Sequence, residues 1–169
     1  MDVEDAIRTR RTHKAFGQEP VPRETLAELL ELARWAPNHH VTEPWRFRVL
    51  GDGSRARLKA AAGPEAAGKL DRAPTLVVSS AVLTGEPERD EEDLHATAVA
   101  TYIVLLGAHA RGLASYWRTP EVLRTPAGRA AVGLGDDERF VGLIHLGAPR
   151  QGREPPPRGA LEDFVDWLP

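Results

Sequence analysis

Apolar residues recur at helical spacing in the first third of the chain. Three of them near the N-terminus fall on one helix face, which predicts an amphipathic helix over residues 2–11. A second helix is expected from about Pro22 to Trp35, because proline is favoured in a first helical turn and the following leucines share one face. The pair Ala36-Pro37 is expected to end this helix.

Strands are predicted where the apolar pattern changes its period. Trp45, Phe47 and Val49 alternate with two arginines, which is typical of a half-buried strand. Further strands are expected at the apolar runs of residues 75–83, 113–117 and 140–146. Helical segments are expected at residues 54–70, which are rich in alanine, and at 120–132.

The longest predicted helix covers residues 93–111, and a charged loop is expected before it at 85–93. Apolar residues occupy more than one side of this helix, so it is expected to be central or to lie at a subunit interface. From Pro149 the tail is predicted to be a loop with an apolar end at Leu161, Phe164, Val165, Trp167 and Leu168. The sequence allows this end to pack on a neighbouring subunit or on its own domain.

Composition narrows the class of protein. With 169 residues the chain has the size of one domain, which we assign to residues 1–169. The formal net charge of −3 argues against a nucleic-acid partner, since such binding needs many cations to neutralise phosphates. The absence of cysteine excludes disulfides and thiolate catalysis. The acidic N-terminus and the lack of an apolar run of roughly 18 residues favour a cytoplasmic protein without a membrane partner.

Positive charges cluster where the first helix is expected to end. Arg10, Arg11 and Lys14 lie within five residues of one another, with the hydroxyl of Thr12 between them. Their mutual repulsion is unfavourable unless an anion lies close by, and guanidinium groups pair well with phosphate. The cluster therefore predicts a local anion site. A solvated basic face, paired with the carboxylates of the first helix, is the alternative.

Two other segments are candidate binding sites. The stretch from Pro37 to Phe47 connects a helix to a strand, and its two prolines favour extended backbone around several polar residues. Adjacent His39 and His40 in extended backbone would point in opposite directions, so no metal site is expected. Trp117, Arg118 and Thr119 stand at the end of a predicted strand. They are either a phosphate-binding group or an ordinary strand end.

Several motifs carry a resemblance to a known family. The run Arg10-Arg11-Thr12-His13-Lys14-Ala15-Phe16 is similar to the signature Arg-x-Ser/Thr-x-Lys/Arg-x-Phe. The stretch from Ala36-Pro37 to Pro44-Trp45-Arg46-Phe47 is similar to the pattern Ala-Pro-x-x-x-x-x-x-Pro-Trp-x-Phe. Residues 115–119 and 141–149 resemble further segments of the same proteins. The chain thus resembles, over nearly its whole length, the short-chain nitroreductase-like FMN flavoproteins.

The resemblance implies an α+β fold with a central, mostly antiparallel sheet flanked by helices. It also implies an intertwined homodimer with FMN at the subunit interface. From one subunit, FMN is expected to be bound by Arg10, Arg11 and Thr12. From the other subunit, the flavin is expected to be reached by Trp35, Pro37, Asn38 and His39.

The remaining cofactor-binding residues follow from the same likeness. The segment that closes on the ribityl phosphate corresponds to Trp117, Arg118 and Thr119. Lys14 corresponds to a position near the pyrimidine side of the flavin, where a positive charge stabilises the reduced ring. Larger relatives bind the phosphate with a C-terminal Lys/Arg pair, for which this chain offers only Arg150, Arg153 and Arg158.

The implied activity is an FMN-dependent oxidoreductase that takes electrons from NADH or NADPH. Its small-molecule electron acceptor is expected to be a nitroaromatic, a quinone or an activated alkene, and the catalytic proton donor is not identified. One alternative is a flavin-binding protein of the same fold that serves flavin fragmentation, dehalogenation or sensing. A second alternative, of another class, is a module that binds an anion or nucleic acid through the basic cluster.

Overall fold

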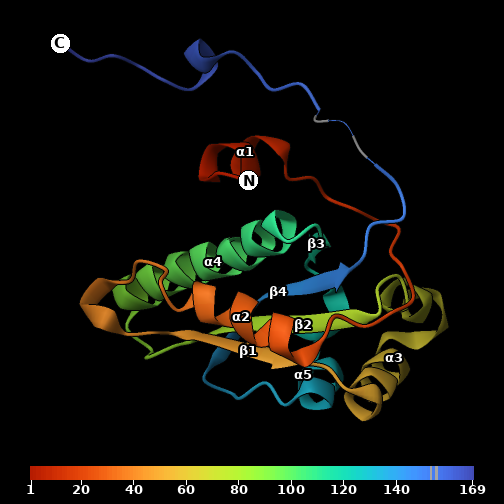
Figure 1. Cartoon of the computed structure of the whole chain (residues 1–169). Helices are drawn as coiled ribbons and strands as arrows, with labels where there is room; N and C mark the ends of the chain where they lie inside the picture. The colour runs from red at the N-terminus through yellow and green to blue at the C-terminus, as the bar shows by residue number, and fades with distance from the viewer. Residues whose placement is uncertain (153, 155) are drawn as a thin grey trace.

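Four antiparallel strands form the centre of the molecule in the order β1-β2-β4-β3 (Figure 1). The structure is a computed structural model, and it describes residues 1–152, 154 and 156–169. The strands are β1 (Trp45–Val49), β2 (Thr75–Val82), β3 (Ala114–Arg118) and β4 (Glu138–Gly147). All four predicted strands and the antiparallel sheet are therefore confirmed.

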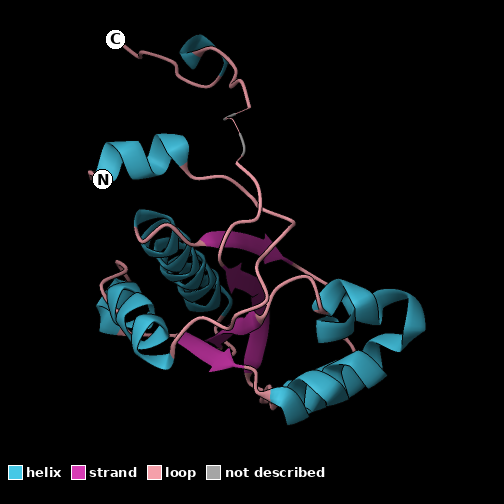
Figure 2. Cartoon of the chain, turned by 45° about the vertical axis from the view of Figure 1, so that its right-hand side comes forward, coloured by secondary structure: helices cyan, strands magenta, loops and turns pink. Residues whose placement is uncertain are grey.

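Helices cover both faces of this sheet. They are α1 (Val3–Thr9), α2 (Arg23–Ala33), α3 (Asp52–Ala67), α4 (Pro87–Ala110) and α5 (Pro126–Val132). Short 3-10 turns occur at His39–Val41, Gly68–Leu70, Glu121–Arg124 and Leu161–Asp163. Figure 2 shows α2 and α4 on one side of the sheet and α3 and α5 on the other.

Strand alternation divides the interior into two cores. Val77 of β2 packs in the cluster under α2 and α4, whereas Leu76 and Val78 pack in the cluster under α3 and α5. A β-bulge between Ser79 and Ser80 shifts the pairing of β2 with β4. Strand β2, one of the two inner strands, is therefore buried on both faces, as its continuous apolar run predicts.

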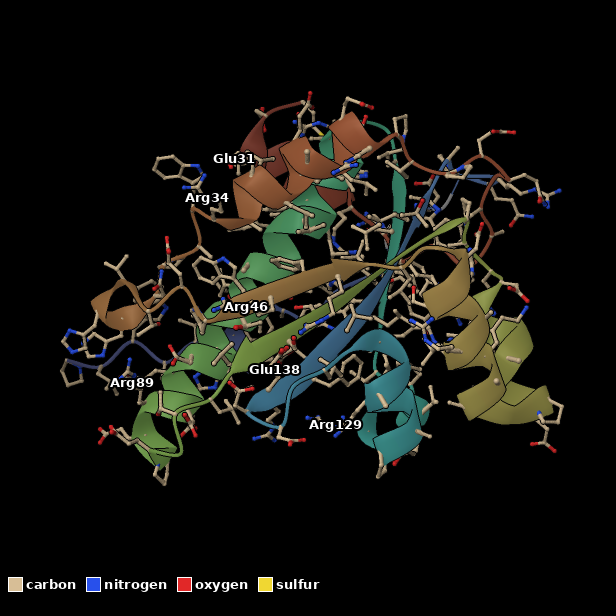
Figure 3. The ribbon with its side chains drawn as sticks, turned by 90° about the horizontal axis from the view of Figure 1, so that it is seen from below. Glu31, Arg34, Arg46, Arg89, Arg129 and Glu138 are labelled. Carbon is tan, nitrogen blue, oxygen red and sulfur yellow. The ribbon has the colours of Figure 1, made fainter. Side chains whose placement is uncertain are left out.

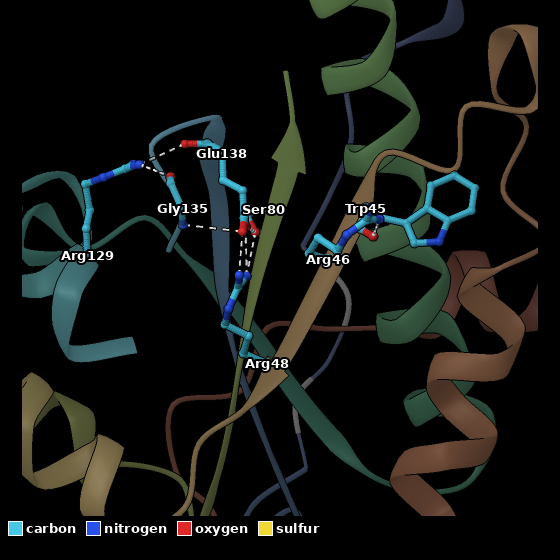
Figure 4. Close-up of polar contacts among 7 residues, drawn as sticks. All are labelled: Trp45, Arg46, Arg48, Ser80, Arg129, Gly135 and Glu138. Atoms are coloured by element: carbon cyan, nitrogen blue, oxygen red, sulfur yellow. Dashed lines mark hydrogen bonds and ion pairs between the residues drawn. The ribbon is translucent and has the colours of Figure 1, made fainter. Parts of the chain in front are cut away.

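A charged cluster, the Arg48–Glu138 clamp, joins three strands on the α5 side of the sheet (Figures 3 and 4). Arg48 donates from Nη1 to Oε2 of Glu138 at 2.8 Å and from Nη2 to Oε1 at 2.5 Å. Ser80 Oγ donates to the same carboxylate at 2.5 Å, and Arg129 of α5 donates to the backbone oxygen of Glu138 at 3.0 Å. Burial alone would raise the pKa of Glu138, but the hydrogen bonds from Arg48 and Ser80 hold this pKa below its ordinary value.

The start of α4 corrects one prediction. Residues 85–93 were expected to form a charged loop, but the helix begins at Pro87 and includes most of them. Proline fits a first helical turn, and Glu88 and Asp90 are favourable there because the helix N-terminus carries partial positive charge. Acidic residues that look like a solvated loop therefore extend the helix.

The C-terminal tail runs away from the sheet and its helices (Figure 1). Its apolar side chains remain exposed: Leu161 at 55%, Phe164 at 67%, Trp167 at 86% and Leu168 at 87%. Of the two arrangements that the sequence allows, packing on its own domain is therefore not observed. Arg153, one of the three candidate tail arginines, lies outside the described residues. Within the described ranges, no helix has the length and apolar character that a membrane span needs.

Candidate functional site

The basic segment after α1 follows the edge strand of the sheet. Thr12 forms an isolated parallel bridge with Ser115 of β3, and the backbone N–H of His13 donates to the backbone oxygen of Ser115 at 3.0 Å. Phe16 pairs with Pro149 beyond the end of β4. These contacts fix the segment beside β3, the strand that leads to Trp117.

The arginines of this segment have different surroundings. Arg8 forms an exposed ion pair with Glu4 at 3.1 Å, which is the solvated arrangement that the alternative predicted. Arg10 places its guanidinium over the ring of Tyr102 in α4, 5.5 Å from the ring centre. Arg11 is only 7% exposed, and its Nη1 donates to the backbone oxygen of Arg10 at 2.5 Å.

Arg11 is one of several described residues with buried polar atoms that lack a hydrogen-bond partner, and the only arginine among them with two such nitrogens. Its Nε and Nη2 are buried and have no hydrogen-bond partner among the described residues. The buried hydroxyl of Ser115 also has no hydrogen-bond partner among the described residues. A buried guanidinium without a counter-charge is unfavourable, so the free nitrogens of Arg11 suit an anionic ligand.

Arg11 faces a cavity of about 430 Å³. Its lining comes from the N-terminal segment, the end of α4 and the start of the tail, and includes Met1, Thr9, His13, His109, Leu113 and Arg150. His109 is 2.8 Å from the hydroxyl of Thr9. Burial lowers the pKa of His109, and the nearby charges of Arg10, His13 and Arg11 lower it further. The cavity is therefore electropositive and suited to an anion.

The end of β3 forms a second, open hollow. A cavity of about 490 Å³ is lined by Tyr116, Trp117, Arg118 and Thr119. The indole N–H of Trp117 donates to the backbone oxygen of Val141 at 3.2 Å. The guanidinium of Arg118 lies over the ring of Tyr116, 5.8 Å from its centre. Trp117 is thus held by the sheet, while Thr119 is exposed and free to contact a ligand.

The loop of residues 38–43 differs from its prediction. Extended backbone was expected, but His40, Val41 and Glu43 have φ values of 52°, 53° and 45°. The rings of His39 and His40 therefore stack, 4.0 Å apart, instead of pointing in opposite directions. No group of three or more metal-ligating side chains is present among the residues that the structure describes.

The structure brings only some of the predicted site residues together. Arg10, Arg11, Thr12 and the end of β3 lie along one edge, whereas Trp35, Pro37, Asn38 and His39 follow α2 near the start of α4. His39 contacts Glu92 of α4, while Arg10 lies over the ring of Tyr102 of the same helix. Ten residues separate these two contacts along α4, which corresponds to about 15 Å. Lys14 is exposed beside the first group.

Sequence reasoning missed His109, because it lies in an apolar element far from the basic segment in sequence. It placed Ser115 in a motif but gave this residue no role of its own. The sequence analysis also gave Arg10 and Arg11 the same role, although the fold decides which guanidinium is buried. No pattern in the sequence distinguishes Arg11 from Arg10.

The chain is similar in sequence to proteins of a known family. The Nitroreductase family model matches residues 7–70. A Bacillus subtilis protein named "Putative NAD(P)H nitroreductase YfhC" is 31% identical in an alignment 180 residues long, which covers 95% of this chain and 91% of that protein. The chain belongs to the nitroreductase family.

Solved nitroreductase structures share the fold. A nitroreductase-like family protein from Bacillus cereus has a TM-score of 0.89 at 26% identity, covering 99% of this chain and 96% of its own. A "putative nitroreductase in complex with FMN" from Desulfovibrio desulfuricans has a TM-score of 0.82 at 25% identity, with coverage of 100% and 98%. The α+β nitroreductase fold that the motifs predict is confirmed.

Proposed function

We propose that this nitroreductase-family protein is an FMN-dependent oxidoreductase that takes electrons from NADH or NADPH. Its acceptor is a small electron-poor molecule such as a nitroaromatic, a quinone or an activated alkene. The name of the Bacillus subtilis relative and the FMN complex of the Desulfovibrio desulfuricans protein support this assignment. The motifs quoted above support it independently.

The buried guanidinium of Arg11 carries the proposal. Two of its nitrogens lack partners among the described residues, and it faces an electropositive cavity of about 430 Å³. A phosphate fits this chemistry, because a guanidinium donates several parallel hydrogen bonds to phosphate oxygens. The residues present therefore fit the phosphate end of FMN.

Individual roles follow from this fit. The phosphate would be held by Arg10, Arg11 and Thr12, and the end of β3 would close on it through Trp117, Arg118 and Thr119. Exposed Lys14 would place a positive charge near the ring. Bound FMN would supply the centre that accepts hydride, and the protein would orient it, set its potential and exclude water.

A second copy of the chain would complete the site. The two groups of candidate residues contact α4 about 15 Å apart, at Tyr102 and at Glu92, and Arg11 and His39 line different cavities of the single chain. Apolar side chains are also exposed on α1, α2 and α4, just after α2, and in the tail: Val3, Ile7, Leu32, Val99, Trp35, Phe164 and Trp167. Large exposed apolar side chains of this kind suit a subunit interface. We therefore propose a homodimer in which Trp35, Pro37, Asn38 and His39 of one copy reach the flavin held by the other, each copy forming one domain of residues 1–169.

The test is spectroscopic. Purified protein is mixed with FMN, freed of unbound flavin by gel filtration, and treated with NADH or NADPH without oxygen. We expect retained flavin whose visible absorption bleaches and returns when a nitroaromatic or quinone is added. A colourless protein after FMN treatment would refute cofactor binding, and a yellow protein that neither nucleotide bleaches would refute the oxidoreductase assignment. Light scattering should give the mass of two chains.

A further inference from the structure

The loop of residues 38–43 has an unfavourable backbone. His40, Val41 and Glu43 lie in the left-handed region at φ values of 52°, 53° and 45°, and none of them is glycine. A side chain with a Cβ rarely adopts this conformation, and a β-branched valine does so least readily. Such strain persists only where the surrounding structure holds it, and it clusters at functional sites.

Interactions within the loop fix part of this shape. Asn38 accepts the backbone N–H of Glu43 through Oδ1 at 2.9 Å, and its Nδ2 donates to the backbone oxygen of Ala36 at 3.1 Å. The side chain of Asn38 is therefore committed at both of its polar atoms. The loop would keep this arrangement only if its far end were also fixed.

Two contacts fix the loop to α4. His39 Nδ1 lies 2.7 Å from Oε2 of Glu92, but the two side chains are 59% and 44% exposed. Thr42 Oγ1 donates to Oδ1 of Asp93 at 2.5 Å, and Asp93 is only 3% exposed. Exposed pairs contribute little, whereas a buried hydrogen bond to a carboxylate is among the stronger ones. The Thr42–Asp93 bond is therefore the principal anchor.

The carboxylate of Asp93 is also a rigid attachment point. It lies within the 24 residues of α4, the helix that packs against α2 and all four strands. Thr97 of the next turn donates its hydroxyl to the backbone oxygen of Asp93 at 2.8 Å. The position of the loop is thus set by the central scaffold of the domain.

We propose that Thr42 and Asp93 are positioning residues, which hold the strained 38–43 loop in the shape that presents Asn38 and His39 to the flavin of the second copy. The proposal rests on the proposed function for the identity of the ligand. The anchoring itself is a property of the chain without ligand. The two claims can therefore be tested separately.

The experiment compares Thr42→Val, which removes the hydroxyl at similar size, with Thr42→Ser, which keeps it. Thr84→Val is the matched control, because Thr84 Oγ1 donates to Asp90 of the same helix at 3.0 Å but lies outside the loop. Amide hydrogen exchange of residues 36–44 is measured without FMN. We expect Thr42→Val to speed exchange at Glu43, while Thr42→Ser and Thr84→Val match the wild-type protein.

A second readout uses the flavin. We expect Thr42→Val to weaken FMN binding roughly tenfold, as for one lost hydrogen bond to a charged group, and to shift the visible spectrum and potential of bound flavin. Thr42→Ser should restore both within about twofold, allowing for its smaller packing. If Thr42→Val leaves loop exchange unchanged, the anchoring is wrong. If exchange rises but affinity, spectrum and potential stay at wild-type values, the positioning role is wrong.

These outcomes separate the two proposals. A wild-type protein that binds no FMN would refute the proposed function, while the exchange measurement would still decide the anchoring. Asp93→Asn guards against a fold defect in Thr42→Val, because the amide oxygen can still accept from Thr42. We expect its exchange and affinity to lie between those of the wild type and Thr42→Val, and wild-type values for both would contradict the proposal.

Discussion

Removing the charge of Glu138 is predicted to destabilise the fold. Glu138→Gln keeps the shape of the side chain but leaves Arg48 without its ion pair. Breaking a buried ion pair costs about 3–5 kcal/mol. The side chain of Arg48 is 26% exposed and that of Glu138 only 9%, so water can partly resolvate the arginine. We therefore expect a loss of about 2–3 kcal/mol in the free energy of unfolding at neutral pH.

The assay is urea denaturation followed by tryptophan fluorescence at several pH values. The hydrogen bonds of the clamp lower the pKa of Glu138, so its contribution to stability is present above the ordinary glutamate pKa and is lost as pH falls through the lowered value. The difference between wild type and Glu138→Gln should therefore be constant near neutrality and shrink in acid.

Controls separate the clamp from a general loss of charge. Exposed Glu121→Gln should change stability by less than about 0.5 kcal/mol, as most surface substitutions do. Arg48→Met combined with Glu138→Gln should cost less than the sum of the two single substitutions, because each removes the same interaction. A Glu138→Gln protein as stable as wild type, or a deficit independent of pH, would refute the reasoning.

Two further substitutions test the packing of the sheet. Gly142→Ala would place a Cβ 2.0 Å from Nε1 of Trp117, so we expect denaturation to show a loss of about 1–3 kcal/mol, and unchanged stability would show that the indole can move. His145 is fully buried, and burial lowers its pKa to about 3. As pH falls below the ordinary histidine pKa, this residue is therefore protonated in the unfolded chain before it is protonated in the folded protein. The free energy of unfolding of the wild type should therefore fall by up to about 2 kcal/mol between pH 7 and pH 5, and this pH dependence should be absent from His145→Leu. Equal pH profiles of the two proteins would contradict this role of His145.

Local signals in the sequence predicted most of the secondary structure. The alternation around Phe47 and the continuous run of β2 gave strands, because side-chain period and burial are linked along a single segment. The acidic start of α4 was misassigned, since composition suggested solvent exposure whereas position in the helix decides its effect. Local periodicity therefore fails where a helix end is stabilised by charge.

The candidate site was predictable only as a set of segments. Its motifs assigned Arg10, Arg11 and Thr12 to cofactor binding, but only the structure shows that this segment lies beside β3. The surroundings of Arg11 come from the end of α4 and the start of the tail, which lie roughly 100 and 140 residues away in sequence. The left-handed loop and its bond to Asp93 likewise depend on tertiary contacts that no local pattern records.

The central claim is that the buried guanidinium of Arg11 binds the phosphate of FMN. It is tested most directly by fluorescence titration of FMN into the wild type and into the variants Arg11→Ala and Arg8→Ala. The two variants each remove one positive charge, from positions three residues apart. We predict that Arg11→Ala weakens FMN binding by about 1.5–3 kcal/mol, the scale of hydrogen bonds to a charged group. Arg8, which pairs with Glu4 in solvent, should be replaceable with little change. Equal FMN affinity for Arg11→Ala and wild type would contradict the account.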